Sequence, residues 1–259
     1  MLPPSHGRTT PLRPLKWYKK LATIKGRLEA GAFLIEGDRG IRQIMSHHPG
    51  EIIEIITIEE PPPVYHNHSI HLVTYRQFHS ICSTKTPQGI IAVVRLPQDM
   101  YSGHLPENIG TKILLLEDIQ DPGNVGSLIR TAAAFNFSGI ILTEKCADPL
   151  SPKCVQSTAG TILSVWLRRT SHYLKLAKAL KKDGYSFVAT ALNGAEEPSI
   201  LYRQDKLLLA LGNEASGLSQ AVLHASDYQL RIPTIREKAE SLNVAACGAI
   251  CMYLSSQKC

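Results

Sequence analysis

The sequence predicts an α/β protein whose larger part is built on a mostly parallel sheet, and two observations carry this prediction. Short apolar runs of strand length alternate with helical patterns along residues 111–259. Three segments bearing Gly, Asn and Ser follow such runs directly, as loops do at the carboxyl ends of parallel strands. This alternation is typical of a parallel sheet that is covered by helices on both faces.

Charge and composition divide the 259-residue chain into four regions. Residues 1–28 carry seven Lys or Arg and no acidic residue, so we expect a basic flexible arm over 1–25. Such an arm either contacts RNA phosphates or is simply solvated. Residues 26–96 are expected to form a compact α/β domain, and 97–110, with two prolines and two glycines, a linker. The second domain then spans residues 111–259.

Individual elements follow from hydrophobic patterning, β-branching and turn residues. In the first domain we expect strands at 33–36, 51–58 and 89–95, and helices at 39–46 and 74–82. In the second domain we expect strands at 112–117, 139–143, 186–191, 206–211 and 228–232. Its helices are expected at 126–136, 153–159, 172–182, 218–225 and 242–255.

Composition excludes several classes of protein. No run reaches the roughly 18 apolar residues of a membrane helix, so no membrane association is expected. The six cysteines include no C-x-x-C pair, which is typical of reduced thiols in a cytoplasmic protein and excludes a zinc ribbon. We interpret His66, His68 and His71 as scattered exposed histidines and expect no metal site. The net charge of +6 favours a polyanionic partner.

The first of the three segments covers residues 121–140. Its start has turn chemistry, and Gly126 lets the backbone pass close to another group. The expected helix carries Arg130 within its first turns, where a cation opposes the helix dipole. Arg130 is therefore either part of a site or a surface residue on an ordinary strand–turn–helix connection.

The second segment covers residues 207–222, where an apolar strand leads into Gly212 and Glu214 and Gly217 precedes a helix. It matches neither a Walker loop nor the G-x-G-x-x-G pattern of nucleotide-binding oxidoreductases. The alternative reading is a plain helix start capped by Ser216 or Ser219.

The third segment covers residues 231–254. A strand ends at Ile232, and Ser241 precedes an unusually small-residue helix. Its small residues are Ala245, Ala246, Gly248 and Ala249. Small side chains suit a helix that packs closely against another chain or a buried loop; the alternative is an ordinary core helix capped by Ser241.

Taken together, the three segments resemble the motifs of the SpoU/TrmH family of RNA ribose 2′-O-methyltransferases, in the SPOUT superfamily. The family motif N-x-G-x-x-x-R is present at 124–130 and G-x-E-x-x-G-L at 212–218. The third motif, I-P followed by E-S-L-N-V, is present at 232–233 and 240–244. Order and spacing both agree with the family across roughly residues 111–256.

The resemblance implies a fold and an activity. Residues 111–259 would form a SPOUT domain with a parallel sheet and a trefoil knot, and S-adenosyl-L-methionine would be the cofactor. The sequence F-L-I-E-G at 33–37 is similar to part of the family's substrate-binding domain, which resembles ribosomal protein L30e. An L30e-like domain over 26–96 favours 23S (large-subunit) rRNA as substrate. A homodimer through the C-terminal helix is also implied.

Alternatives to this activity are a tRNA 2′-O-methyltransferase, an rRNA enzyme that confers resistance to an antibiotic, and a non-catalytic RNA-binding or ribosome-assembly factor with the same fold. An intact set of motif residues argues against the non-catalytic reading.

The resemblance also implies site residues. Arg130 is expected to be the central catalytic residue; because a neutral guanidine is costly, we expect it to stabilise the developing alkoxide and bind the adjacent phosphate. Asn124 would orient the ribose or this arginine, and Glu214 would fix Arg130 or a neighbouring loop. The expected catalytic set is Asn124, Arg130, Glu214, Ser241 and Asn243. The expected cofactor contacts are Leu211, Gly212, Ile232, Leu242 and Val244.

Overall fold

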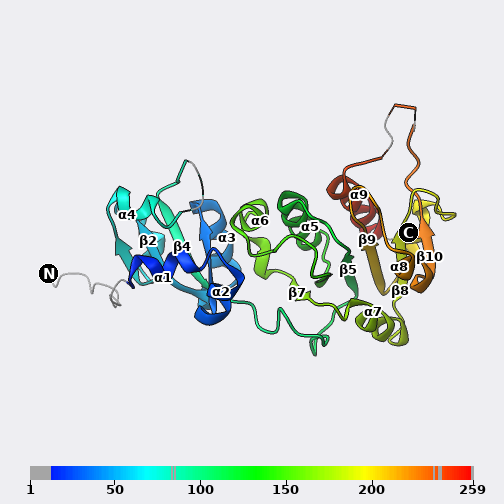
Figure 1. Ribbon diagram of the computed structural model, residues 1–259, viewed down its shortest axis with the longest axis horizontal. Coiled ribbons are helices and arrows are strands. Elements are labelled where there is room, and N and C mark those ends of the chain that lie inside the picture. Colours follow the sequence, from blue (N-terminus) through cyan, green and yellow to red (C-terminus); the bar gives the residue numbers. More distant parts are fainter. Residues whose placement is uncertain (1–12, 83, 85, 236, 239–240, 258–259) are drawn as a thin grey trace. The chain divides into compact units, whose positions relative to one another are not determined.

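The computed structural model describes residues 13–82, 84, 86–235, 237–238 and 241–257, and the chain divides into two compact units (Figure 1). Unit 1 comprises residues 1–96 together with 150–163. Unit 2 comprises residues 97–149 and 164–259. Within the described ranges, no helix is long and apolar enough to cross a membrane.

Unit 1 is built on a four-stranded sheet in the order β1-β4-β2-β3. Its strands are β1 (Ala32–Glu36), β2 (Ile52–Thr57), β3 (Ile70–Leu72) and β4 (Ile90–Arg95). Strand β4 pairs antiparallel with β1 and β2, whereas β2 pairs parallel with β3. Its helices are α1 (Leu15–Lys20), α2 (Ile24–Ala30), α3 (Asp38–His47), α4 (Tyr75–His79) and α6 (Pro152–Ser157). Its 3₁₀ turns are η1 (Pro49–Glu51), η2 (Pro63–Tyr65) and η3 (Thr161–Leu163).

Helices α1 and α2 show that the predicted flexible arm is wrong for residues 13–25. Tyr18 is fully buried and Leu21 is 2% exposed, because α1 is amphipathic and its apolar side joins the core of unit 1. The hydroxyl of Tyr18 also donates a hydrogen bond to the buried carboxylate of Glu54. The lysines lie on the exposed side of α1, so charge alone had suggested an arm. The prediction for residues 1–12 lies outside the described part of the chain.

The same buried carboxylate corrects the interpretation of the histidines. His71 is 8% exposed, and its Nε2 lies 3.0 Å from Oε2 of Glu54. A buried carboxylate requires such polar partners, which explains why this histidine is inside the unit. Among the described residues, no group of three or more His, Cys, Asp or Glu could hold a metal ion.

Helix α6 and turn η3 belong to unit 1, although the sequence assigned them to the second domain. Helix α6 contacts β1, and η3 contacts α3. Gly160 has a φ of +89°, and a Cβ there would lie 2.5 Å from the carbonyl oxygen of Gly40. The chain therefore packs backbone against backbone on α3. The order of elements along the sequence cannot reveal that residues 150–163 pack back on unit 1, because these contacts join distant parts of the chain.

Unit 2 contains a six-stranded sheet in the order β10-β8-β9-β5-β6-β7, in which every neighbouring pair is parallel. Its strands are β5 (Lys112–Leu116), β6 (Gly139–Leu142), β7 (Trp166–Arg169), β8 (Ser186–Thr190), β9 (Leu207–Leu211) and β10 (Tyr228–Leu230). Its helices are α5 (Pro122–Ala134), α7 (Tyr173–Lys182), α8 (Gln220–Ala225) and α9 (Val244–Ser256), with the 3₁₀ helix η4 (Pro198–Arg203). The expected parallel α/β sheet is confirmed.

Strand β7 was not predicted from the sequence. It contains Arg168, which is only 4% exposed and donates hydrogen bonds to the carbonyl oxygens of His104 and Leu167. Two consecutive arginines resemble surface sequence, whereas here Arg168 is buried and its guanidinium is satisfied by backbone carbonyl groups.

The strand register places the carboxyl ends of the central strands at one level. Leu116 of β5 lies opposite Leu142 of β6 and Leu211 of β9. Strands β6 and β7 extend the sheet on one side of β5, and β9, β8 and β10 extend it on the other. Strands that follow β5 in the sequence are therefore added first on one side of it and then on the other. Such a change of side is a topological switch point, and open α/β sheets bind ligands at the carboxyl ends of the strands there.

Helix α9 packs closely on unit 2 through its small residues. A Cβ at Gly248 would lie 2.4 Å from Cδ2 of Leu128 on α5 and 2.8 Å from Cδ1 of Leu211 on β9. The absent side chain at this position therefore lets α9 approach α5 and the sheet within its own chain. Asn243 caps the helix, so the alternative reading in which Ser241 is the cap is wrong.

Candidate active site

The three motif segments all leave the same edge of the sheet. The first follows β5, the second follows β9 and the third follows β10. Because these strands are parallel, their carboxyl ends face one side, as expected from the sequence.

Helix α5 begins earlier than predicted, at Pro122 instead of 126. The carboxylate of Asp121 caps it by accepting a hydrogen bond of 3.0 Å from the backbone N–H of Asn124. Proline fits the first position of a helix, because its fixed φ is helical and no N–H is lost there. The residues interpreted as a turn are therefore the cap and first turn of the helix, and Asn124 lies in that turn.

One residue from each motif meets in a hydrogen-bonded network. Asn124 donates through Nδ2 to Oε1 of Glu214 at 2.8 Å, and its Oδ1 accepts a bond of 3.1 Å from Nδ2 of Asn243. Asn243 in turn accepts the backbone N–H groups of Ala245 and Ala246 through its Oδ1. The structure thus brings together three of the five expected catalytic residues.

The direction of this network is fixed by its two ends. The backbone N–H groups of α9 can only donate, so the carbonyl of Asn243 must face them and its NH₂ must face Asn124. Asn124 then offers its own NH₂ to Glu214, which as a carboxylate can only accept. The donor and acceptor ends of the Asn124 and Asn243 side-chain amides are therefore both fixed by their partners, and neither amide can be flipped without losing hydrogen bonds.

The loop between β9 and α8 is closed on itself. Asn213 and Gly217 exchange backbone hydrogen bonds of 3.1 and 2.9 Å, and Oδ1 of Asn213 accepts the N–H groups of Ala215 and Ser216. A Cβ at Gly212 would lie 2.3 Å from the carbonyl carbon of Gly217, so only glycine fits there. This closed loop presents Glu214 toward the network.

Arg130 lies apart from the network. It is exposed, two turns further along α5 than Asn124, rather than in the first turns of the helix. Among the described residues its side chain makes no hydrogen bond or ion pair, and Glu214 binds Asn124 instead of Arg130. The guanidinium is therefore available to an anionic ligand. Ser241 is likewise exposed.

Some of the expected cofactor contacts have backbone groups free to bind a ligand. Within the described part of the chain, the backbone groups of Gly212, Ile232 and Leu242 make no hydrogen bond, although Gly212 is buried. Gly212 and Ile232 follow strands β9 and β10, and Leu242 precedes α9, so unpaired backbone donors and acceptors lie at the ends of these elements. Leu211 differs, because its carbonyl accepts the N–H of Glu117. Val244 is 7% exposed.

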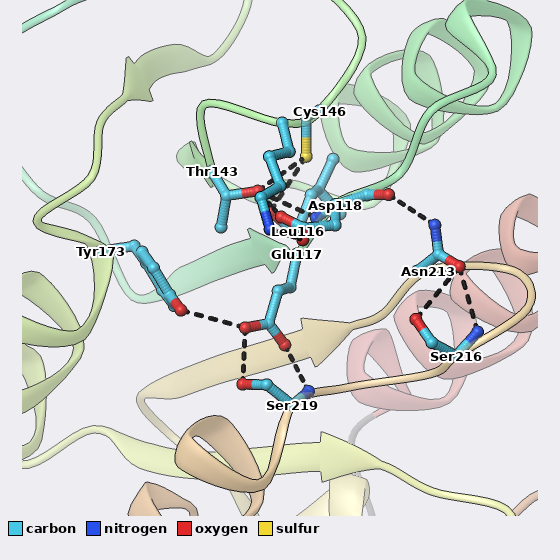
Figure 2. Close-up of polar contacts among 10 residues, drawn as sticks. Leu116, Glu117, Asp118, Thr143, Cys146, Tyr173, Asn213, Ser216 and Ser219 are labelled. Atoms are coloured by element: carbon cyan, nitrogen blue, oxygen red, sulfur yellow. Dashed lines mark hydrogen bonds and ion pairs between the residues drawn. The ribbon is translucent and has the colours of Figure 1, made fainter.

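Sequence reasoning missed a second polar cluster beside this network (Figure 2). Its residues are Glu117, Asp118, Thr143, Tyr173, Asn213 and Ser219. Glu117 is 4% exposed and accepts hydrogen bonds from Tyr173 and Ser219. Burial, followed by the nearby Glu117 carboxylate, raises the pKa of Tyr173 above its usual value. The one available signal was an acidic residue directly after an apolar strand.

Fold and site together define a methyltransferase of the SPOUT class, with a parallel α/β domain and polar motif loops at the carboxyl ends of its strands. Residues 111–253 match the model of the SpoU rRNA Methylase family, and residues 14–92 match the MRM3-like substrate binding domain. The chain belongs to the SpoU rRNA methylase family.

Curated relatives cover nearly the whole chain. It is 31% identical over 242 residues to the 23S rRNA (guanosine(2553)-2′-O)-methyltransferase RlmP of Bacillus subtilis, covering 92% of this chain and 94% of RlmP. It is also 31% identical over 254 residues to an uncharacterised tRNA/rRNA methyltransferase of Synechocystis, covering 95% and 91% of the two chains.

Solved structures show the same fold. The SpoU methyltransferase AviRb of Streptomyces viridochromogenes, in complex with AdoMet, superposes with a TM-score of 0.80 at 25% identity, covering 93% of this chain and 96% of AviRb. An AdoMet-bound rRNA methyltransferase from Sinorhizobium meliloti gives a TM-score of 0.77 at 26% identity, covering 95% of each chain. The expected SPOUT fold, enzyme class and cofactor are thereby confirmed.

Proposed function

We propose that this protein transfers a methyl group from S-adenosylmethionine to the 2′-hydroxyl of a ribose in 23S ribosomal RNA. The observation that carries the proposal is the network of Asn124, Glu214 and Asn243, which joins all three motifs at one edge of the sheet. The similarity to RlmP, a 23S rRNA 2′-O-methyltransferase, supports both the reaction and the RNA class.

The reaction requires a hydroxyl to lose its proton as it attacks a methyl carbon. The bound cofactor supplies a methyl group on a positively charged sulfur. Arg130 is exposed and free of partners among the described residues, so its guanidinium binds the phosphate next to the target ribose and stabilises charge on the 2′-oxygen. A guanidinium gives up its proton only at high energetic cost, so binding and stabilising negative charge is an easier role for Arg130 than removing a proton.

The remaining motif residues hold the reacting groups in place. Glu214 keeps the NH₂ of Asn124 occupied, and Asn243 donates to its carbonyl, so the Asn124 side chain has one orientation. Ser241, which is exposed beside the start of α9, hydrogen-bonds the RNA. The backbone groups of Gly212, Ile232 and Leu242 bind the adenosine part of the cofactor.

Unit 1 binds the RNA substrate in this proposal, because residues 14–92 match a substrate-binding domain. Helix α1 presents Lys16, Lys19 and Lys20 as exposed side chains, and the guanidinium of Arg13 lies 4.2 Å from the ring of Trp17. Exposed cations of this kind bind phosphates and make affinity depend on salt. A cytoplasmic location also belongs to the proposal, because bacteria such as those of both curated relatives make ribosomal RNA there.

A homodimer through α9 is the final part of the proposal. This helix is apolar on more than one face, and Ile250 and Tyr253 are 39% and 51% exposed. Covering such side chains with a second copy removes apolar surface from water. Sedimentation of Tyr253→Glu should show a monomer where the unmodified chain sediments as a dimer.

The test of the function is transfer of labelled methyl from S-adenosylmethionine to unmodified transcripts of 23S rRNA, 16S rRNA and tRNA, followed by nucleoside analysis. Label in a 2′-O-methylnucleoside of 23S rRNA is the expected result, and Arg130→Ala serves as the control with strongly reduced transfer. Label in tRNA alone would overturn the RNA class. Absence of label from transcripts and assembled subunits alike would favour a non-catalytic RNA-binding protein.

A further inference from the structure

The last residue before the first motif loop, Glu117, carries a buried carboxylate that no motif accounts for. It directly follows β5 and is 4% exposed. Its Oε1 accepts hydrogen bonds from the hydroxyls of Tyr173 at 3.1 Å and Ser219 at 2.7 Å. Its Oε2 accepts the backbone N–H of Ser219 at 2.7 Å. Figure 2 shows the carboxylate between these two residues.

The next residue, Asp118, holds the opposite end of the same loop. Its carbonyl oxygen accepts a bond of 2.8 Å from Nδ2 of Asn213. Asp118 has a φ of +57°, an uncommon left-handed conformation that must be supported by its surroundings. That support comes from Thr143, whose Oγ1 accepts the N–H of Asp118 at 2.9 Å and donates to its Oδ1 at 2.6 Å.

Two consecutive residues therefore fix both ends of the loop that runs from Asn213 to Ser219 (Figure 2). Between these ends the loop is closed by the Asn213 and Gly217 backbone pair. Glu214 stands within it, and Gly212 immediately precedes it. A shift of the loop would move the carboxylate that orients Asn124 and the backbone groups assigned to the cofactor.

We propose that Glu117 is a positioning residue, which sets cofactor affinity and the rate of methyl transfer by anchoring the 213–219 loop through Ser219. The proposal rests on the proposed function for its kinetic consequence, although the anchoring itself can be measured without turnover. It assigns Glu117 no contact with the cofactor or the RNA, because its carboxylate oxygens are occupied by Ser219 and Tyr173.

Hydrogen-bond chemistry distinguishes anchoring from a need for charge. In Glu117→Gln, the amide oxygen can still accept the N–H of Ser219, and the NH₂ can donate to the hydroxyl of Ser219 or Tyr173, each of which can accept. In Glu117→Ala, all three bonds are lost. If Glu117 acts by anchoring, Glu117→Gln should keep most of the cofactor affinity and methyl-transfer rate. If its charge is needed, Glu117→Gln should be as defective as Glu117→Ala.

The experiment compares Glu117→Ala and Glu117→Gln with a matched control in unit 1, Glu54→Gln. Glu54 is a carboxylate of similar burial, 2% exposed, that accepts bonds from Tyr18 and His71. Three quantities are measured well below each variant's Tm: amide hydrogen exchange in residues 213–219 of the cofactor-free protein, Kd for S-adenosylmethionine by calorimetry, and kcat and KM for methyl transfer.

The expected result is that Glu117→Ala loses at least tenfold of the exchange protection at Ser219, binds the cofactor at least tenfold more weakly and has a lower kcat. Glu117→Gln should stay within about threefold of the unmodified protein in Kd and kcat, as expected for a retained neutral bond. Glu54→Gln should lower Tm without changing Kd.

Unchanged exchange and Kd in Glu117→Ala would overturn the inference, as would a Gln variant that is as defective as Ala. Faster exchange and weaker binding in Glu117→Ala support it even when the unmodified protein methylates neither rRNA nor tRNA. In that case the proposed function fails and the anchoring role stands.

Discussion

The bond between Asn243 and Asn124 gives a prediction in which stability and activity separate. Asn243 has two roles: its Oδ1 caps α9 by accepting the N–H groups of Ala245 and Ala246, and its Nδ2 donates to Asn124. Asn243→Ala removes both roles, whereas Asn243→Asp keeps the capping oxygen and loses only the donor. Comparing the two substitutions isolates the network from the helix cap.

The structure sets the size of each effect. Loss of an N-cap costs about 1 kcal/mol, and loss of the exposed bond to Asn124 costs about 0.5–1 kcal/mol. For a chain of this size, these losses correspond to a fall in Tm of about 3–8 °C in Asn243→Ala. In Asn243→Asp, a negative charge at the start of α9 contributes about 0.3–1 kcal/mol, so Tm should stay within about 2 °C of the unmodified protein.

Activity should fall in both variants. In Asn243→Asp, a carboxylate oxygen faces Oδ1 of Asn124, and two acceptors repel each other. Rotating the Asn124 amide would relieve this repulsion only by turning its oxygen toward Glu214. We expect kcat to drop by about 10- to 100-fold, in the range of a misplacement of about 1 Å in an active site.

Thermal unfolding and labelled-methyl transfer to the preferred transcript check both parts. A normal rate in Asn243→Asp would show that the network does not position the site. A fall in Tm as large as that of Asn243→Ala would show instead that Oδ1 of Asn243 is not the cap.

Three further predictions concern single side chains. Arg130→Ala should lower kcat about 10²- to 10³-fold, as for loss of one group that stabilises developing charge, with an unchanged calorimetric Kd for the cofactor. Gly212→Ala should weaken cofactor binding more than tenfold by calorimetry, because its Cβ would meet backbone 2.3 Å away; unaltered binding would contradict the loop geometry. Burial and the Glu54 carboxylate raise the pKa of Tyr18 to about 12. The phenol of the unfolded chain ionises at about pH 10. The stability that comes from the raised pKa of Tyr18 is therefore complete below about pH 10 and is lost as the pH rises toward about 12. Tyr18→Phe should therefore flatten the decline of the urea midpoint between pH 9 and 11, and an equally steep decline in this variant would contradict the assignment.

The convergence of the motif residues could be predicted because it depends on a simple rule. Parallel strands end at one edge, so segments that follow them meet there, and Asn124, Glu214 and Asn243 do meet. The predicted start of α5, at residue 126, was wrong because Asp121 and Pro122 suit a turn as well as the cap and first position of a helix. Which partner Glu214 binds could not be predicted, since that choice depends on the arrangement of the loop.

The missed features depend on contacts between distant parts of the chain. Glu117 has no sequence pattern of its own; its partners lie 56 and 102 residues away, at Tyr173 and Ser219. The helical structure of residues 13–25 could not be predicted because α1 has a basic exposed side and only Tyr18 on its buried side. In both cases the polar or charged residues were visible in the local sequence, whereas the distant residues that bury them could be seen only in the folded structure.

The return of residues 150–163 to unit 1 limits how this chain can be divided and exchanged. A fragment that ends at residue 96 lacks α6 and η3. It would expose the face of β1 and β4 where Leu34 and Ile91, with Pro152 and Val155, line a cavity of about 320 Å³. Grafting unit 1 onto another enzyme would therefore require transplanting two separate stretches of sequence. Because residues 150–163 lie between β6 and β7 in the sequence, no single cut in the chain separates the two units.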